Sequence, residues 1–446
     1  MRSHASLRSS RVQVMNELLP WILYGVPAVV AFTLYLRNQR SRTQMHHELL
    51  LESVAQGLTE PPSLHPVIDN TRCIGSGACA KACPEDALGV VDGKAVLISA
   101  AACIGHGACF SACPVEAIKL VFGTEKRGVD IPVVKPNFES NIPGIFIAGE
   151  LGGMGLIRKA AEQGRQAIDA ASTAMEGDAE YDVVIVGAGP AGIAAGLTAI
   201  DRKLKYKILE QEESLGGAVF HYPRNKIAMT APVKLPLVGK VKMTEVTKEH
   251  LLDFWNGIVE KTGLEISFRE RMEEIVKDES GFSVRTARES YRCKTVLLAI
   301  GRRGTPRKLD VPGEEASKVV YRLVDPEQYR GQRVLVVGGG DSALEAAVSI
   351  STQKGARVTL SYRSEAFSRV KEKNRAALKR AEEKQRIRVL LPSTVSRIEH
   401  DRVHLKYKDE KVAIRNDIVI VCAGGELPTP LLKKIGVMFE THHGDT

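Results

Sequence analysis

The 446-residue sequence predicts an α/β protein with two nucleotide-binding, Rossmann-like domains, preceded by a small α+β domain and one N-terminal transmembrane helix. Three observations predict this class: two glycine-rich turns that each follow an apolar run, two cysteine runs of matching spacing, and an uncharged apolar segment near the N-terminus. A composition of 44% hydrophobic and 26% charged residues suits a folded chain of about three domains.

The apolar segment, Leu18–Leu36, contains no charged residue. As a helix, its 19 residues would extend about 28 Å, close to the hydrocarbon thickness of a bilayer. A cleaved signal peptide is the alternative, but the segment is long for one, and Arg37 follows it instead of a small-residue cleavage site. We therefore expect an N-terminal tail at 1–17, an anchor at 18–37 and a juxtamembrane linker at 38–66 with a short helix near Glu48–Val54.

Six of the eight cysteines lie in two runs of matching spacing, which are Cys73, Cys79 and Cys83 before Pro84, and Cys103, Cys109 and Cys113 before Pro114. The position three residues after the first Cys is Ser76 in one run and His106 in the other. This usage indicates cofactor ligation in a reducing compartment instead of disulfide bonds.

The runs resemble the bacterial two-cluster ferredoxin pattern C-x2-C-x2-C-x3-C-P, over residues 67–122. In that family the last Cys of each run ligates the other cluster, which implies one site from Cys73, Cys79 and Cys113 and another from Cys103, Cys109 and Cys83. Three thiolates are enough for a [3Fe-4S] cluster, whereas a [4Fe-4S] cluster would need Ser76, His106 or an outside ligand. Zinc is the alternative, because Cys3His is also a tetrahedral zinc set.

The first nucleotide-binding fold is predicted at residues 181–210. The apolar strand Tyr181–Val186 leads into a turn that contains Gly187, Gly189 and Gly192, then a helix over 191–202 and a strand that ends at Glu210. The glycines let the backbone approach a pyrophosphate at the helix N-terminus, and the acid hydrogen bonds a ribose hydroxyl.

The second fold begins with the strand Arg333–Val337 and a turn that contains Gly338, Gly340 and Ala343. Its next strand, Arg357–Ser361, ends without an acid. Because an acid there favours NAD(H) and an arginine favours the 2′-phosphate of NADP(H), we expect Arg363 and Arg369 to bind that phosphate.

The two folds in tandem resemble the thioredoxin-reductase-like flavoproteins over residues 181–446. The resemblance implies an FAD-binding domain at 177–312, an inserted NAD(P)-binding domain at 313–416 and a return segment of the FAD domain at 417–446. The family's nucleotide domain carries a Cys-x-x-Cys pair that this chain lacks there, so we do not expect disulfide reduction by the family mechanism.

Members of that family end in a strand and a helix that close over FAD, and the corresponding pieces lie here ahead of the first fold. They are Asn141–Glu150, with the sequence NIPGIFIAGE, and Gly164–Ala167, which matches the family's Arg-Gln-Ala helix motif. The resemblance implies that a helix around Ile157–Ala171 covers the flavin. The simplest interpretation is a circular permutation, with 123–176 as the closing segment. The resemblance then implies FAD contacts at Gly149, Glu150, Gln166, Gly216 and Gly217. His221, which follows these last glycines, is a candidate acid or base, with packing or FAD contact as the alternative.

We expect a membrane-anchored oxidoreductase that passes electrons between NAD(P)H, FAD and two iron–sulfur clusters to a membrane or soluble redox partner. It would be a single-pass protein of the cell membrane with its cofactor domains in the cytoplasm. A disulfide reductase without its own Cys-x-x-Cys and a non-enzymatic redox sensor are the alternatives. The net charge of +9 permits an anionic membrane surface or an acidic partner, while nucleic-acid binding is not expected because no aromatic-studded basic tract is present. The oligomeric state stays open, with a homodimer as one option.

Overall fold

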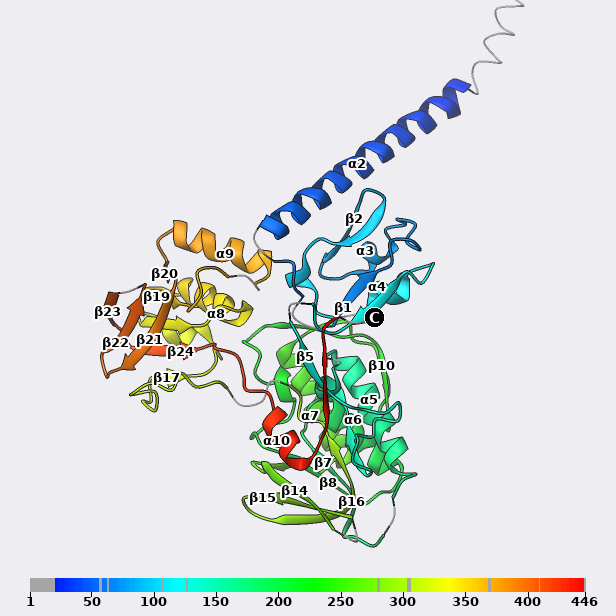
Figure 1. Cartoon of the computed structure of the whole chain (residues 1–446), viewed down its shortest axis with the longest axis vertical. Helices are drawn as coiled ribbons and strands as arrows, with labels where there is room; N and C mark the ends of the chain where they lie inside the picture. Colours follow the sequence, from blue (N-terminus) through cyan, green and yellow to red (C-terminus); the bar gives the residue numbers. More distant parts are fainter. Residues whose placement is uncertain are drawn as a thin grey trace, which may run out of the picture. The chain divides into compact units, whose positions relative to one another are not determined.

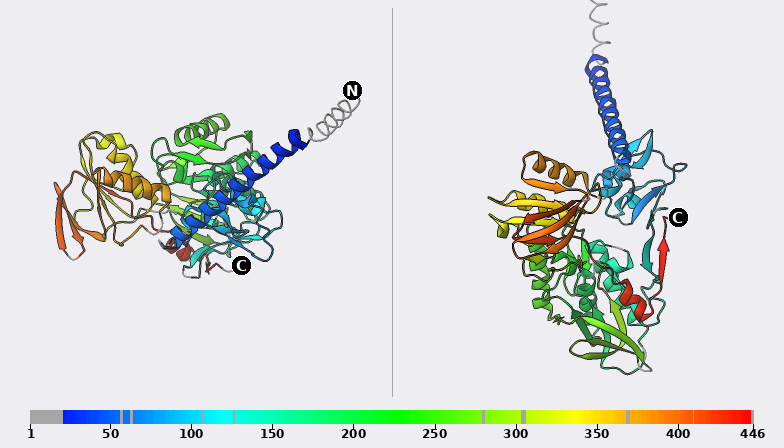
Figure 2. Two further views of the ribbon diagram at one scale, coloured as in Figure 1. Left: turned by 90° about the horizontal axis from the view of Figure 1, so that it is seen from above. Right: turned by 60° about the vertical axis from the view of Figure 1, so that its left-hand side comes forward.

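A computed structural model describes residues 21–444, except 56–57, 62–63, 106, 126, 154, 176, 279–280, 303–305, 368–369 and 409. The chain divides into two compact units. The first comprises Met1–Thr59, Pro66–Ala100 and Gly107–Lys119, and the second comprises Glu60–His65, Ala101–His106 and Leu120–Thr446. Figure 1 follows the chain through its elements, and Figure 2 gives two further views.

The N-terminal segment is a π-helical turn, η1 (Trp21–Gly25), followed by the long helix α2 (Val26–Ala55). The short helix expected near Glu48–Val54 is therefore the end of a longer one, and the anchor and linker bounds stay a prediction. Among the described residues no helix has both the length and the apolar character needed to cross a membrane. The uncharged part of α2 covers only Val26–Leu36, which is about 16 Å of helix. Residues 18–20 of the predicted span lie outside the described residues.

The C-terminal half of α2 packs on the cysteine-rich domain within the first unit. The His46 imidazole accepts a hydrogen bond from the Val90 N–H through Nδ1 at 3.1 Å, and the Ser53 hydroxyl donates to the Ile98 carbonyl at 2.8 Å. A Cβ added to Gly89 would lie 2.8 Å from the His46 ring, so only glycine lets the helix approach this closely. This helix is therefore part of the domain instead of a free linker.

The repeat in the cysteine runs becomes a repeat in structure. Each run places a left-handed glycine before a short helix, Gly77 at φ 72° before α3 (Ala78–Ala82) and Gly107 at φ 75° before α4 (Ala108–Ala112). The remaining elements of this part are the paired strands β2 (Leu88–Val91) and β3 (Lys94–Leu97), the turn η2 (Ala100–Ala102), and β1 (His65–Ile68) paired with β4 (Ile118–Val121). β1 begins two residues before the predicted start of this domain at residue 67.

The second unit contains a seven-stranded sheet that positions the candidate dinucleotide site. Its strands are, in order, β13 (Ser267–Phe268), β8 (Tyr206–Glu210), β7 (Tyr181–Val186), β16 (Ser290–Leu298), β15 (Gly281–Thr286) and β14 (Met272–Asp278), with β6 (Ile145–Ile147) also paired to β16. The helices of this part are η3 (Gly149–Gly152), α5 (Ile157–Ala171), α6 (Pro190–Asp201), η4 (Gly217–Val219) and α7 (Lys248–Thr262). Two hairpin pairs complete it: β9 (Ile227–Met229) with β12 (Glu245–Thr247), and β10 (Val233–Leu235) with β11 (Gly239–Val241).

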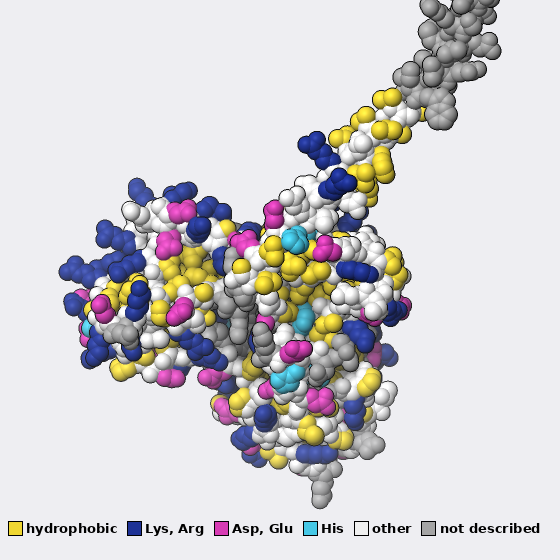
Figure 3. Space-filling view, turned by 45° about the horizontal axis from the view of Figure 1, so that its top comes forward, with side chains coloured by type: hydrophobic (Ala, Val, Ile, Leu, Met, Phe, Trp, Pro, Cys, Tyr) yellow, Lys and Arg dark blue, Asp and Glu magenta, His cyan; other side chains and the backbone are white. Residues whose placement is uncertain are grey.

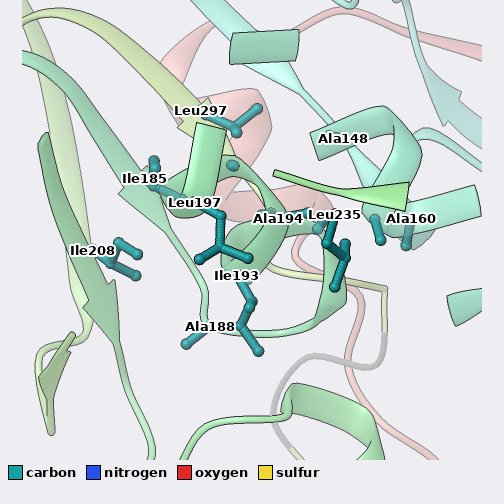
Figure 4. Close-up of a cluster of buried hydrophobic side chains, with 14 of the residues drawn as sticks. Ala148, Ala160, Ile185, Ala188, Ile193, Ala194, Leu197, Ile208, Leu235 and Leu297 are labelled. Atoms are coloured by element: carbon teal, nitrogen blue, oxygen red, sulfur yellow. The ribbon is translucent and has the colours of Figure 1, made fainter. Parts of the chain in front are cut away.

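The core of this part lies where α5 and α6 cross over the sheet. Ile185 of β7, Ile193 and Leu197 of α6 and Leu297 of β16 are fully or almost fully buried there, and Figure 4 shows them gathered with small alanines between them. A Cβ added to Gly164 of α5 would lie 2.0 Å from the Ala191 carbonyl oxygen. The small residues of both helices are thus required by the closeness of the crossing.

The two ends of the flavin-type domain meet as a circular permutation would require. β6 lies beside β16 as a parallel neighbour, and β25 (Phe439–His442), after α10 (Thr429–Ile435), pairs antiparallel with β5 (Val129–Pro132). The Asn141 amide donates to the Gly436 carbonyl at 3.0 Å and accepts from the Met438 N–H at 2.8 Å. Near the chain end, the Gly444 N–H donates to the Phe122 carbonyl at 2.8 Å. The predicted closing segment is therefore built into the same domain as the C-terminal strand.

The inserted nucleotide-binding domain is built on a five-stranded parallel sheet. Its order is β17 (Val319–Val320), β24 (Ile418–Val421), β18 (Arg333–Val337), β19 (Arg357–Ser361) and β20 (Ile387–Leu390). The helices η5 (Pro326–Tyr329), α8 (Asp341–Ser351) and α9 (Glu372–Glu383) pack on one face, and the antiparallel strands β21 (Ser393–Ile398), β22 (Arg402–Tyr407) and β23 (Glu410–Arg415) pack on the other.

Candidate cofactor sites

Three neighbouring strands of the large sheet, β6, β7 and β16, run parallel and end at one edge. A left-handed glycine follows each within three residues: Gly149 at φ 83°, Gly187 at φ 107° and Gly301 at φ 69°. Ligands of open α/β sheets bind outside the carboxyl ends of the strands. This edge is therefore the candidate dinucleotide site, and it combines the predicted Gly149 and Gly187 with Gly301.

The turn Gly187–Gly192 has room for a ligand at only one of its glycines. A Cβ at Gly192 would lie 1.8 Å from the Gly187 carbonyl oxygen, and a Cβ at Gly187 would lie 2.6 Å from the Ala299 carbonyl oxygen. Gly189 is the N-cap of α6, and the atom nearest to a Cβ added there would be the Gly217 Cα at 3.9 Å. The open space lies beside the helix N-terminus, where a pyrophosphate is stabilised by free N–H groups.

Glu210 ends β8 beside this turn, as predicted. Its carboxylate accepts hydrogen bonds from the Ala188 N–H at 2.7 Å and the Glu212 N–H at 2.9 Å. Burial raises the pKa of this carboxyl, and those two N–H groups act against that shift. The side chain thus supports the turn, and its position at the strand end fits contact with a ribose hydroxyl.

Gly216 and Gly217 reach the same turn from a later loop. The Gly216 N–H donates to the Ala188 carbonyl at 2.9 Å, and a Cβ on Gly217 would lie 3.1 Å from the Gly189 Cα. Both glycines have positive φ, at 108° and 54°. The structure therefore brings them to the predicted site, where a larger residue would crowd the turn.

Glu150 lies beside the end of β16. A Cβ built on Gly301 would lie 3.7 Å from the Glu150 Oε2. Burial lowers the pKa of the neighbouring Arg302, and the negative charge of Glu150 partly opposes that shift. The Arg302 guanidinium also donates to the Asp130 carbonyl at 3.2 Å. Arg302 was not predicted from the sequence, although its place directly after Gly301 is a usable signal.

Gln166 was predicted to contact the cofactor, but the glutamine that reaches the candidate site through a hydrogen bond is Gln163. The segment Gly164–Ala167 lies in the middle of α5, which begins at Ile157, and Gln166 faces solvent. The helix expected around Ile157–Ala171 is confirmed as α5. Gln163, one turn earlier, accepts a hydrogen bond from the Gly149 N–H through Oε1 at 2.9 Å. The start of α5 at Ile157 sets which of its side chains meet the sheet edge, and Gln163 is one of them whereas Gln166 is exposed.

His221 is held between two charged side chains. Its Nδ1 contacts the Arg322 guanidinium, its Nε2 lies 3.6 Å from a Glu212 carboxylate oxygen, and the Phe220 ring packs edge-on at 5.3 Å. These contacts favour a packing role, and an acid or base role for His221 stays a prediction.

In the nucleotide-binding domain the second glycine-rich turn joins β18 to α8. Gly340 is the N-cap of α8, Ala343 is fully buried inside its first turn, and a Cβ on Gly338 would lie 2.3 Å from the Cys422 carbonyl oxygen. Arg363 follows the end of β19 and is exposed, as a contact to a nucleotide phosphate requires. Arg369 lies outside the described residues.

Three of the predicted cluster ligands come together in the first unit. Cys73 and Cys79 are buried, and Cys113 is half-buried. The pKa of the Cys79 thiol is raised first by burial and also by the nearby Cys73 and Cys113. Backbone N–H groups point at two of the sulfurs, from Ala95 to Cys73 at 3.4 Å and from Ala117 to Cys113 at 3.2 Å. Such donors suit ligated thiolates, so these residues fit an iron–sulfur cluster.

The second predicted set is divided between the two units, with Cys103 in one and Cys83 and Cys109 in the other, so it stays a prediction. His106 lies outside the described residues, and Ser76 is exposed, with its hydroxyl 3.5 Å from the Ala78 N–H. In the described part of the chain no three His, Cys, Asp or Glu side chains are grouped so as to hold a single metal ion.

The two remaining cysteines are isolated in strands or directly after one. Burial raises the pKa of both Cys293 and Cys422 to about 12. Since the thiolate is the reactive form, neither thiol suits disulfide exchange at neutral pH.

Comparison with known proteins identifies both parts of the chain. The family described as pyridine nucleotide-disulphide oxidoreductase matches residues 184–445, and a 4Fe-4S dicluster domain matches residues 65–114. A ferredoxin--NADP reductase from Thermus thermophilus is 31% identical over 258 residues, covering 54% of this chain and 72% of the relative. A ferredoxin--NADP reductase from Streptococcus gordonii is 34% identical over 190 residues, covering 42% of this chain and 55% of the relative.

Solved structures show the same fold. A bacillithiol disulfide reductase from Bacillus cereus superimposes with a TM-score of 0.51 at 24% identity, over 58% of this chain and 82% of that protein. The chain thus spans little more than half of the streptococcal relative's length and continues beyond the matched part with its own cysteine-rich domain.

Proposed function

Because the chain belongs to the pyridine nucleotide-disulphide oxidoreductase family, we propose that it is an FAD-dependent NAD(P)H oxidoreductase that exchanges electrons with iron–sulfur clusters in its own dicluster domain. The observation that carries this proposal is the presence of both matched domains in one polypeptide. Relatives named ferredoxin--NADP reductase supply a precedent for the pairing of a nicotinamide reductase with a ferredoxin. Here the ferredoxin-like partner is covalently attached.

The residues at the sheet edge would bind and orient FAD. The turn Gly187–Gly192 would hold the pyrophosphate at the start of α6, and Glu210 would hydrogen bond a ribose hydroxyl. Glu150 and Gly149, fixed by Gln163, would close the other end of the site. When bound, FAD converts the two-electron chemistry of a nicotinamide into the one-electron chemistry of clusters.

Residues of the inserted domain would bind the nicotinamide nucleotide. Gly340 leaves space beside the N-terminus of α8, and Arg363 would recognise a 2′-phosphate. We therefore propose NADP(H) as the preferred nucleotide and NAD(H) as the weaker one.

The test is an anaerobic reduction of the purified full-length protein. NADPH should first reduce the flavin, seen by its visible absorbance, and then the clusters, seen by low-temperature electron paramagnetic resonance. Replacing Cys79 by alanine should leave flavin reduction intact and abolish the signal of one cluster. Clusters that dithionite reduces but NADPH does not would contradict the proposal.

A disulfide reductase is the less favoured function. The isolated, buried Cys293 and Cys422 with raised pKa values give it no thiol pair in the described part of the nucleotide-binding domain. This alternative would be supported if a low-molecular-weight disulfide drove NADPH oxidation and the rate were unchanged in Cys79→Ala. A sensor without catalysis would show negligible turnover with artificial electron acceptors.

We also propose that the N-terminal segment attaches the protein to a membrane, with the cofactor domains in the cytoplasm. Large apolar side chains are exposed on the described part of this segment, including Leu23, Phe32 and Leu34, each 61% exposed. Figure 3 shows hydrophobic side chains on the surface of this helix. Arg37, Arg40 and Arg42 follow them and suit an anionic lipid surface. Removal of residues 1–37 should shift the protein from the membrane fraction to the soluble fraction, and a control with Leu51→Ala should not.

A further inference from the structure

The two nucleotide-binding folds of this chain can be compared position by position, because each joins a strand to a helix through a glycine-rich turn. From this comparison we propose that Tyr362 binds the 2′-phosphate of NADP(H), at the position that Glu210 occupies in the first fold. The proposal rests on the nucleotide binding in the proposed function, and it names a further residue that selects NADP(H) over NAD(H).

The register of β7 and β8 defines the position of the candidate ribose-binding acid in the first fold. The last pair of these strands is Val186 with Leu209, and the N–H of the following Gly187 donates to the Leu209 carbonyl oxygen at 2.7 Å. Glu210 comes next, and its carboxylate accepts a hydrogen bond from the N–H of Ala188, the middle residue of the turn, at 2.7 Å. An acid at this strand end is the usual partner of a ribose hydroxyl.

The same register recurs in the second fold. The last pair of β18 and β19 is Val337 with Ser361, and the N–H of the following Gly338 donates to the Ser361 carbonyl oxygen at 2.9 Å. The residue after Ser361 is Tyr362. Tyr362 therefore stands where the first fold has its acid.

The Tyr362 ring lies over the middle residue of the second turn, Gly339, which corresponds to Ala188 of the first turn. A Cβ added to Gly339 would lie 2.4 Å from both Cδ2 and Cε1 of that ring. Since these two carbons are on opposite sides of the ring, the position is above the ring face. The Phe367 ring stacks on Tyr362 with centroids 5.6 Å apart and planes inclined by 10°. Two neighbours thus fix the orientation of the tyrosine ring.

The hydroxyl of Tyr362 is available to a ligand. The side chain is half-buried, and its hydroxyl makes no hydrogen bond to any residue in the described part of the chain. The backbone, in contrast, is held on both sides: its N–H donates to the Leu390 carbonyl at 3.3 Å, and its carbonyl accepts from the Ser393 N–H at 2.7 Å. A Cβ on Gly340, the next residue of the turn, would meet no atom within 4 Å. The open space of the turn therefore begins one residue after the glycine that the ring covers.

A phenol at this position suits a phosphate better than a carboxylate does. An ionised acid repels the negative 2′-phosphate and instead accepts a hydrogen bond from a ribose hydroxyl. A phenolic hydroxyl is an uncharged donor, and a hydrogen bond that it makes to a phosphate is strengthened by the charge of the phosphate. With Arg363 directly after it, Tyr362 gives this strand end two donors for a phosphate and no negative charge.

The test is nucleotide binding to the full-length protein, measured by isothermal titration calorimetry with NADP+, NAD+ and 2′-AMP. Tyr362→Phe keeps the ring and removes only the hydroxyl. It should weaken the binding of NADP+ and of 2′-AMP by about tenfold, as expected for a lost hydrogen bond to a charged group, and leave NAD+ nearly unchanged. The double variant Gly339→Ala with Tyr362→Glu copies the first fold and should reduce the preference for NADP+ over NAD+ further than Tyr362→Phe does.

The matched control is Tyr407→Phe on β22, in the small antiparallel sheet that packs on the other face of this domain. It should leave all three affinities in place. Unchanged NADP+ binding in Tyr362→Phe, or equal losses with NADP+ and NAD+, would overturn the proposal. Because NADP+ delivers no electrons, affinities that change as expected in a protein whose clusters NADPH fails to reduce would refute the proposed function alone.

Discussion

Arg363 follows β19 at the point where nucleotide-binding folds choose between NAD and NADP. Its guanidinium is exposed, and a charge-assisted hydrogen bond to phosphate contributes roughly 1.5–3 kcal/mol. Arg363→Ala should therefore raise the NADPH concentration needed for half-maximal flavin reduction by about tenfold. The requirement for NADH should stay nearly unchanged, and stopped-flow titrations with both nucleotides measure the difference. Equal losses with both nucleotides would show that Arg363 is structural.

The free energy of unfolding should depend on pH through Glu210, and burial of its carboxyl sets the direction of that dependence. Its pKa lies above the ordinary 4.5, so its contribution to stability is complete below that value and is lost as pH rises through the folded-state pKa. The free energy of unfolding of the FAD-free protein, measured with urea, should therefore fall from pH 5 to pH 8 more in the wild type than in Glu210→Gln. A parallel pH dependence of the two proteins would show that the carboxyl titrates normally.

At the scale of elements, the crossing of α5 and α6 depends on Gly164. A Cβ on residue 164 would lie 2.0 Å from the Ala191 carbonyl oxygen. A packed core leaves no room for either helix to move away from this overlap. Gly164→Ala should lower the free energy of unfolding by about 1–3 kcal/mol and weaken FAD retention, because α5 also carries Gln163. Thermal unfolding and flavin content after gel filtration measure both effects.

The matched control for this change is Gly257→Ala on α7, where a Cβ would meet no atom within 4 Å. There alanine should stabilise the helix by about 0.5–1 kcal/mol. A similar loss of stability in both variants would mean that helix propensity, instead of the crossing, governs the result.

At the scale of the whole molecule, the permutation predicts which pieces can be reconnected. The Gly444 N–H bonds the Phe122 carbonyl, and β25 pairs with β5, so the chain end lies against the start of the closing segment. A chain that begins at Asp178 and ends at Thr446 should lose FAD, because it lacks β6 and α5. Joining residues 123–176 after Thr446 through a short glycine-serine linker should restore FAD binding. Equal flavin affinity of the short fragment and the reconnected chain would refute the permutation.

The sequence by itself determined the features that depend on local chemistry. The glycines of the two turns, Glu210 at a strand end and the spacing of the cysteines each have a fixed geometric meaning along the chain, so their positions could be predicted. The thiolate set Cys73, Cys79 and Cys113 was also predictable, although only from a resemblance to known two-cluster domains.

Tertiary structure decided the features that depend on contacts between distant residues. Gln163 instead of Gln166 reaches Gly149 because the start of α5 sets which face meets the sheet edge. α2 docks on the cysteine-rich domain because His46 and Ser53 bind backbone groups of another segment, which no local pattern shows. The contact of Arg302 with the Asp130 carbonyl likewise joins segments that are distant in the sequence. Local propensity fixes where the chain turns, whereas the packing of distant segments fixes which side chains meet.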